Sequence, residues 1–136
     1  MPKKEKKKYL SYSEALLRLE KYCVYQDRCH QEVRSKLIEL GVYGDELEEI
    51  IVALISENFL NEERFARSYA RGKFRTTGWG RRKILIELKR RKISDYCIRK
   101  AMTEIEEIEY QERLETILEK KNRVLRESDP YKRRQK

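Results

Sequence analysis

The chain repeats its apolar pattern at an interval of 51 residues, and this repeat limits the possible folds more than any other feature of the sequence. Shifting the sequence by that interval places apolar residues on apolar residues without a gap. The matched pairs are Ala15/Ala66, Val33/Ile84, Leu37/Leu88, Val42/Ile93, Leu47/Ile98, Ile50/Ala101, Ile51/Met102 and Leu54/Ile105. A constant offset is typical of duplicated units that stack into an array. We therefore expect a modular protein.

Within each unit the apolar residues follow the spacing of amphipathic helices. In the first unit, Ser13 is expected to cap a helix that ends near Gln26. A second helix is expected over residues 30–40, ended by Gly41, and a third over residues 45–58. Charged residues make up 42% of the chain, whereas glycine and proline number only five and two, and this composition favours helices over strands.

The second unit predicts three further helices. Asn61 is expected to cap the first of them, which ends at a glycine-containing break at residues 76–80. The next helix is expected over residues 81–91. Ser94 is expected to cap the last helix, which ends near residue 107.

A third unit begins and is not completed. A seventh helix is expected over residues 109–126, after which Asp129 and Pro130 would open another. The predicted fold is therefore all-α, an elongated tandem array of three-helix repeats of about 51 residues with an incomplete third repeat. The expected division is a disordered basic leader at 1–12, repeats at 13–60 and 61–108, and a partial repeat at 109–136.

The positive charge of the chain is concentrated in one block. Between Arg64 and Lys92 there are twelve lysines and arginines and one acid, Glu87, which gives the block a charge of +11 in a chain whose total is +9. A dense positive surface on folded helices usually faces a polyanion, such as a nucleic acid or an acidic protein surface. A solvated helix face is the alternative interpretation.

The arginines of this block fall on helix faces that can be predicted from their spacing. Arg67, Arg71 and Arg75 recur every four residues and so share one face of a helix. Further cations are expected on the next helix, opposite its apolar positions. The predicted residues for binding a partner or a nucleic acid are Arg67, Arg71, Arg75, Arg81, Arg82, Lys83, Lys89 and Arg90. Trp79 could stack on a base or cover the core, and we favour the core.

We expect no catalytic site, no cofactor and no metal ion. The sequence has no Ser-His-Asp set and no glycine-rich phosphate loop. Cys23, Cys29 and His30 do not have a standard zinc-ligand spacing. The remaining candidate ligands are four glutamates that we interpret as a solvated helix face: Glu104, Glu106, Glu107 and Glu109.

The composition also bears on location. No run of 18 apolar residues is present, so no membrane span is expected. The odd number of cysteines and the lack of an export signal predict a reduced, cytoplasmic setting.

The motifs of the second unit closely resemble the central repeat of the RecX regulatory proteins. That repeat has the pattern R-F-A-x-x-Y-x-R-x-R, then G-[YW]-G-x-x-[RK]-I-x-x-E-L, then G-[IV]. The matching residues are Arg64-Phe65-Ala66-x-x-Tyr69-x-Arg71-x-Lys73, then Gly78-Trp79-Gly80-x-x-Lys83-Ile84-x-x-Glu87-Leu88, then Lys92-Ile93. The resemblance covers about residues 13–126. The chain departs from the family pattern at residues 27–30 and in its unfinished third unit.

The resemblance implies a regulator of DNA recombination, repair and the SOS response. RecX proteins are elongated helical modulators that bind in the groove of the RecA filament on single-stranded DNA, where they restrain filament growth, ATP hydrolysis and strand exchange. By this resemblance the partners would be the RecA filament and single-stranded DNA, contacted directly or through the filament. We expect a monomer without enzymatic activity.

Two other functions stay open from the residues themselves. A general nucleic-acid-binding helical module could act through the same basic block. An assembly protein could instead pair its arginine faces with acidic patches of another protein.

Overall fold

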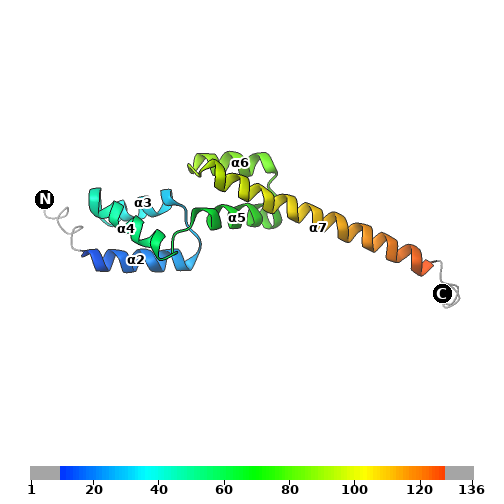
Figure 1. Cartoon of the computed structure of the whole chain (residues 1–136), viewed down its shortest axis with the longest axis horizontal. Coiled ribbons are helices and arrows are strands. Elements are labelled where there is room, and N and C mark those ends of the chain that lie inside the picture. The colour runs from blue at the N-terminus through cyan, green and yellow to red at the C-terminus, as the bar shows by residue number, and fades with distance from the viewer. Residues whose placement is uncertain (1–9, 128–136) are drawn as a thin grey trace.

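A computed structural model describes residues 10–127, and in this part of the chain the protein forms six α-helices, one π-helical turn and no strand. The predicted leader therefore lies mostly outside the described residues, as do Asp129 and Pro130. The elements are α2 (Tyr12–Tyr25), α3 (His30–Glu39), α4 (Gly44–Ser56), α5 (Glu62–Gly72), the π-helical turn η2 (Lys73–Thr77), α6 (Arg81–Arg90) and α7 (Asp95–Glu127). Helices α2, α3 and α4 lie together at one end of an elongated molecule, α5 and α6 lie near its middle, and α7 extends to the other end (Figure 1).

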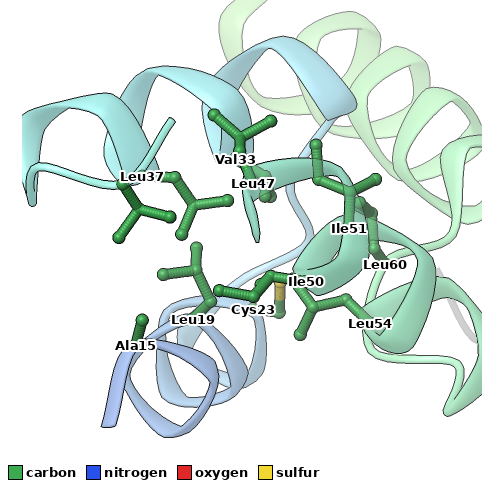
Figure 2. Close-up of a cluster of buried hydrophobic side chains, with 11 residues drawn as sticks. Ala15, Leu19, Cys23, Val33, Leu37, Leu47, Ile50, Ile51, Leu54 and Leu60 are labelled. Carbon is green, nitrogen blue, oxygen red and sulfur yellow. The ribbon is translucent and has the colours of Figure 1, made fainter. Parts of the chain in front are cut away.

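The helices form two three-helix units, each with its own apolar core. Helices α2, α3 and α4 enclose the first core, in which Leu19, Leu37 and Leu54 are fully buried (Figure 2). Helices α5, α6 and α7 enclose the second core, with Ile84 and Leu88 fully buried. All the matched apolar pairs of the 51-residue repeat are buried in both units, except that Met102, the partner of Ile51, is only partly buried. The all-α tandem arrangement is therefore confirmed.

Helix starts are set by side chains that accept the first free backbone N–H groups. Asn61 caps α5 through a 2.9 Å hydrogen bond from the Arg64 N–H, as predicted. The predicted cap of the first helix was wrong, because Ser11 and not Ser13 occupies that position. The Ser11 hydroxyl accepts from the Glu14 N–H, and the Glu14 carboxylate accepts from the Ser11 N–H. This reciprocal capping box fixes the start of α2.

Three helices end in the same way, with one residue in the left-handed conformation. These residues are Gly41 after α3, Asn58 after α4 and Lys92 after α6, with φ angles of 87°, 64° and 62°. In each case the following N–H bonds back to a carbonyl five residues earlier, as Val42 does to Leu37. Gly41 and Lys92 are one repeat interval apart, so a lysine stands where the first unit has glycine.

The two helices predicted over residues 94–107 and 109–126 are one continuous helix, α7. Residues 95–127 contain neither glycine nor proline, and the predicted junction falls at Ile108, which is buried. Nothing in that stretch therefore ends the helix. Figure 1 shows α7 crossing the second unit and continuing away from it.

The two units are joined by side chains that cross between them. Cys29 precedes α3 in the first unit, yet it is fully buried in the second core. Arg64 of α5 forms a 2.8 Å ion pair with Asp27 and also donates to the carbonyls of Asn58 and Phe59. These contacts fix the basic block of the second unit relative to the first.

Candidate partner interface

The eight predicted site residues lie on α5, η2 and α6, but the structure divides them into two groups. Some face α7 and have a carboxylate partner within the fold. The others are exposed and have, among the described residues, at most one weak carboxylate partner. We describe the paired group first, because its geometry differs from what the sequence indicated.

Arg67 and Arg71 converge on one carboxylate of α7. The Arg67 Nη1 lies 2.6 Å from Glu104 Oε2, and the Arg71 Nη1 lies 2.9 Å from Glu104 Oε1. Arg67 also pairs through its Nε with Glu63, one turn earlier on α5, at 3.0 Å. Only 20% of the Glu104 side chain is exposed, so its interpretation as part of a solvated face was wrong. This triad holds α7 against α5.

The protonation behaviour of Glu104 reflects the two arginines. Burial by itself would raise the pKa of Glu104, but the hydrogen bonds from Arg67 and Arg71 outweigh it, and the pKa of Glu104 is lowered. The pKa of Arg67 is raised, mainly by its hydrogen bonds to Glu104 and Glu63. Both shifts favour the charged forms, so the ion pairs are present at neutral pH.

Arg81, at the start of α6, forms an ion pair with Glu109 of α7. This ion pair joins the first turn of α6 to α7, just as the ion pairs of Arg67 and Arg71 with Glu104 join α5 to α7. Glu109 therefore also departs from the predicted solvated face. Glu106 and Glu107 are exposed, in agreement with that interpretation.

The outer side of α6 carries four cations, Arg82, Lys83, Lys89 and Arg90, which we call the outer α6 face. All four are exposed, and they lie opposite the buried Ile84 and Leu88 of the same helix. Among the described residues, the only carboxylate that pairs with this face is Glu87, 3.6 Å from Arg90, whose side chain is 73% exposed. The outer α6 face is therefore a positive surface with little internal compensation.

A second group of cations surrounds Trp79. Lys73 and Lys83 place their ammonium groups 4.8 Å and 4.5 Å from the centre of the indole ring. Trp79 is partly buried against the second core and meets Tyr69 edge to face, which agrees with the core interpretation. Such cation–π contacts hold both ammonium groups near the indole ring. Arg75 of η2 is exposed and has no ion pair within residues 10–127.

Sequence reasoning did not single out Arg91, which occupies the junction of the two units. Its side chain is 26% exposed, and its Nη1 lies 3.4 Å from Glu32 Oε2 of α3. Its guanidinium carbon lies 5.2 Å from the centre of the Tyr69 ring. One signal was available: Arg91 stands one repeat interval after Leu40, which packs on the first core. A cation in an apolar position of a repeat indicates a specific internal partner.

The candidate metal ligands do not assemble in the described residues. No three His, Cys, Asp or Glu side chains in residues 10–127 lie close enough together to hold a metal ion. Cys23, Cys29 and Cys97 are buried free thiols. Burial raises the pKa of Cys23 to about 11, so its thiol is neutral at physiological pH. No helix in the described part of the chain is long and apolar enough to cross a membrane.

Comparison with known proteins places these features in one family. The sequence pattern of the second three-helix domain of RecX matches residues 61–102. Regulatory protein RecX from Clostridium perfringens strain 13 (type A) is 32% identical over 111 residues, which cover 80% of this chain and 51% of that protein. The same values hold for Regulatory protein RecX from strain SM101. The crystal structure of RecX from Lactobacillus salivarius has a TM-score of 0.62 and 29% identity, covering 91% of this chain and 81% of that chain.

The fold and the basic surface define an all-α protein of stacked three-helix units with a cationic helix face. The matched family pattern, the curated relatives and the solved structure all support a RecX family protein. It spans about half the length of the curated relatives it matches.

Proposed function

We propose that this protein is a non-enzymatic regulator that acts in the cytoplasm, binds the RecA filament on single-stranded DNA, and restrains ATP hydrolysis, filament extension and strand exchange. Two facts support the proposal. The curated relatives are named regulatory proteins. The outer α6 face also presents four exposed cations with one weak internal partner, and such a surface suits a nucleoprotein filament, whose DNA is a polyanion.

The contact residues we propose are those without strong internal partners, namely the outer α6 face together with Arg75. Arg67, Arg71 and Arg81 were also predicted to contact the partner, but they already share carboxylates with α7. Releasing them would break ion pairs that hold the second unit together. We therefore assign these three arginines a structural role.

The proposal is tested by measuring ATP hydrolysis by RecA on single-stranded DNA while the protein is titrated in. We expect hydrolysis to slow at or below equimolar protein. Replacing the four cations of the outer α6 face by glutamine should remove most of the effect, because the positive surface is lost. Unchanged hydrolysis across the whole titration of the unaltered protein would rule out this activity.

A matched control separates a local surface from net charge. Four exposed cations elsewhere, Arg18 and Lys21 of α2 with Arg123 and Arg126 of α7, are replaced by glutamine, which removes the same total charge. We expect this variant to inhibit RecA like the unaltered protein. Equal loss of inhibition in the two variants would mean that net charge, and not the outer α6 face, is responsible.

The second candidate function is a general nucleic-acid-binding module, favoured by the same exposed cations. The two functions differ in what they retain from a bacterial lysate treated with nuclease. A filament regulator should still retain RecA. A plain nucleic-acid binder should lose every partner when the nucleic acid is digested.

A further inference from the structure

Helix α7 carries two apolar faces on opposite sides of its axis. Its first half buries Ile98, Ala101 and Ile105 in the second core, and Ile108 is buried as well. Beyond residue 109 the large apolar side chains fall on another side: at 100° per residue, they are rotated by roughly 180° from the buried set. They form a stripe that we call the distal stripe, which consists of Tyr110, Leu114, Ile117, Leu118 and Val124.

The distal stripe lies in water within the described part of the chain. Its side chains are between 37% and 59% exposed, with Leu114 the least and Val124 the most exposed. Every residue from 110 to 127 is exposed. A single helix of this length is only marginally stable in water, and most helices are stabilised by packing of an apolar face. An apolar stripe on a projecting helix therefore indicates a partner surface.

The charges beside the distal stripe determine which partner fits it. Glu106 and Glu107 lie at its N-terminal end, and Lys120 and Lys121 lie near its C-terminal end. A partner must offer apolar side chains flanked by the opposite order of charges. A second copy of α7 running antiparallel meets this requirement, because it brings the basic end of one helix against the acidic end of the other. A parallel copy would oppose like charges.

We propose that this protein forms an antiparallel dimer through the distal stripes of two α7 helices. With Leu114 on the two-fold axis, Leu118 lies opposite Tyr110 of the second copy, and Lys121 lies opposite Glu107 of the second copy. The same contacts occur twice, as a two-fold axis requires. The proposed dimer differs from the sequence-based expectation of a monomer. It goes beyond the proposed function, because it uses none of the outer α6 face.

The proposal is tested by sedimentation of the whole chain over a range of concentrations. In this register the contacts run from Glu107 to Lys121, about 21 Å of helix at 1.5 Å per residue. This is a small interface, so we expect a monomer–dimer equilibrium with a Kd on the order of micromolar and no larger assemblies. A monomer at every concentration, or growth into open-ended oligomers, would overturn the proposal.

Two adjacent substitutions give a matched comparison. Ile117→Glu adds a charge within the distal stripe, and Thr116→Glu adds the same charge on the side of α7 away from it. We expect Ile117→Glu to raise the dimer Kd at least about 10-fold and Thr116→Glu to leave it nearly unchanged. Circular dichroism checks that both variants stay helical. Equal effects of the two substitutions would contradict the proposed contact.

The antiparallel direction is tested by reversing charges. Lys121→Glu places like charges opposite each other in the dimer, so we expect its Kd to rise by roughly 10-fold. Adding Glu107→Lys to the same chain restores opposite charges, and we expect the affinity to return. If the double variant is as weak as the single one, Lys121 does not face Glu107 and the antiparallel pairing is wrong.

Discussion

The Arg91 guanidinium reaches from the end of α6 to Glu32 at the start of α3, so that one ion pair spans the boundary between the two units with 3.4 Å between Nη1 and Oε2. The same guanidinium lies over Tyr69 and 3.9 Å from Glu87. A partly buried charge with these partners is costly to delete, because Glu32 and Glu87 are then left without their counter-charge.

We therefore expect Arg91→Ala to reduce the free energy of unfolding by roughly 2 kcal/mol, within the range for breaking a partly buried ion pair. Urea denaturation measures this change. The neighbouring substitution Arg90→Ala is the control, since that side chain is 73% exposed and should matter little. Equal losses in the two variants would show that Arg91 does not join the units.

Lys92→Gly should stabilise the protein. Lys92 has a φ of 62°, which is unfavourable for a residue with a Cβ atom. Glycine removes this penalty, and we expect a gain of about 1 kcal/mol in the free energy of unfolding. Lys89→Gly, in the interior of α6, should instead lose about 1 kcal/mol. A loss in both variants would contradict the left-handed conformation at Lys92.

Glu104→Gln should loosen the packing of α7 on α5 and make the protein less sensitive to acid. The folded pKa of Glu104 is lowered, so its stabilising effect is present above the ordinary glutamate range and is lost as the pH falls through the folded pKa. We expect a loss of about 1 kcal/mol at pH 7, the upper end for partly exposed pairs. Denaturant unfolding measured at pH 7 and at pH 3 checks this. The difference in the free energy of unfolding between the variant and the unaltered protein should be smaller at pH 3 than at pH 7.

Binding to single-stranded DNA should weaken with salt in proportion to the number of phosphates contacted. Replacing the four cations of the outer α6 face by glutamine should flatten the logarithmic salt slope by up to about 2.8 units, at 0.7 per phosphate. Arg67→Gln combined with Arg71→Gln should leave the slope nearly unchanged, because those side chains pair with Glu104. If instead the Arg67→Gln, Arg71→Gln variant flattened the salt slope and the α6 variant did not, Arg67 and Arg71 would be the residues that contact DNA.

Cys23 should make the stability fall at alkaline pH. Its pKa is raised by burial from 9.0 to about 11. A raised pKa favours the neutral thiol in the folded protein, so this contribution is complete below pH 9 and is lost as the pH rises to about 11. A shift of this size corresponds to roughly 2–3 kcal/mol. In the Cys23→Ala variant, the free energy of unfolding should decline less steeply between pH 9 and about pH 11 than in the unaltered protein, whatever its value at pH 7. Urea denaturation at several pH values measures this slope.

The cores were predictable because the repeat identifies residues that occupy equivalent places. Val33 and Ile84, for example, match at the repeat interval and are both fully buried. The continuity of α7 was not predicted, because its apolar face changes side near Ile108, and a change of face in sequence looks like the start of a new helix.

The carboxylate partners of the arginines could not be predicted from helix spacing. Arg67 and Glu104 are 37 residues apart, and their contact depends on how α5 and α7 are rotated against each other. Local periodicity places a side chain on a face of its own helix, but it does not say which other helix covers that face. The predicted contact surface therefore included arginines that form ion pairs within the fold.

The part of α7 beyond residue 109 projects from the second unit, so its direction depends on how the first half of the helix packs around Glu104. Roughly 27 Å of helix extends beyond residue 109, so a tilt of about 10° at the base would move the tip by roughly 5 Å. The ion pairs of Glu104 and Glu109 therefore help to set the direction in which the far part of α7 points.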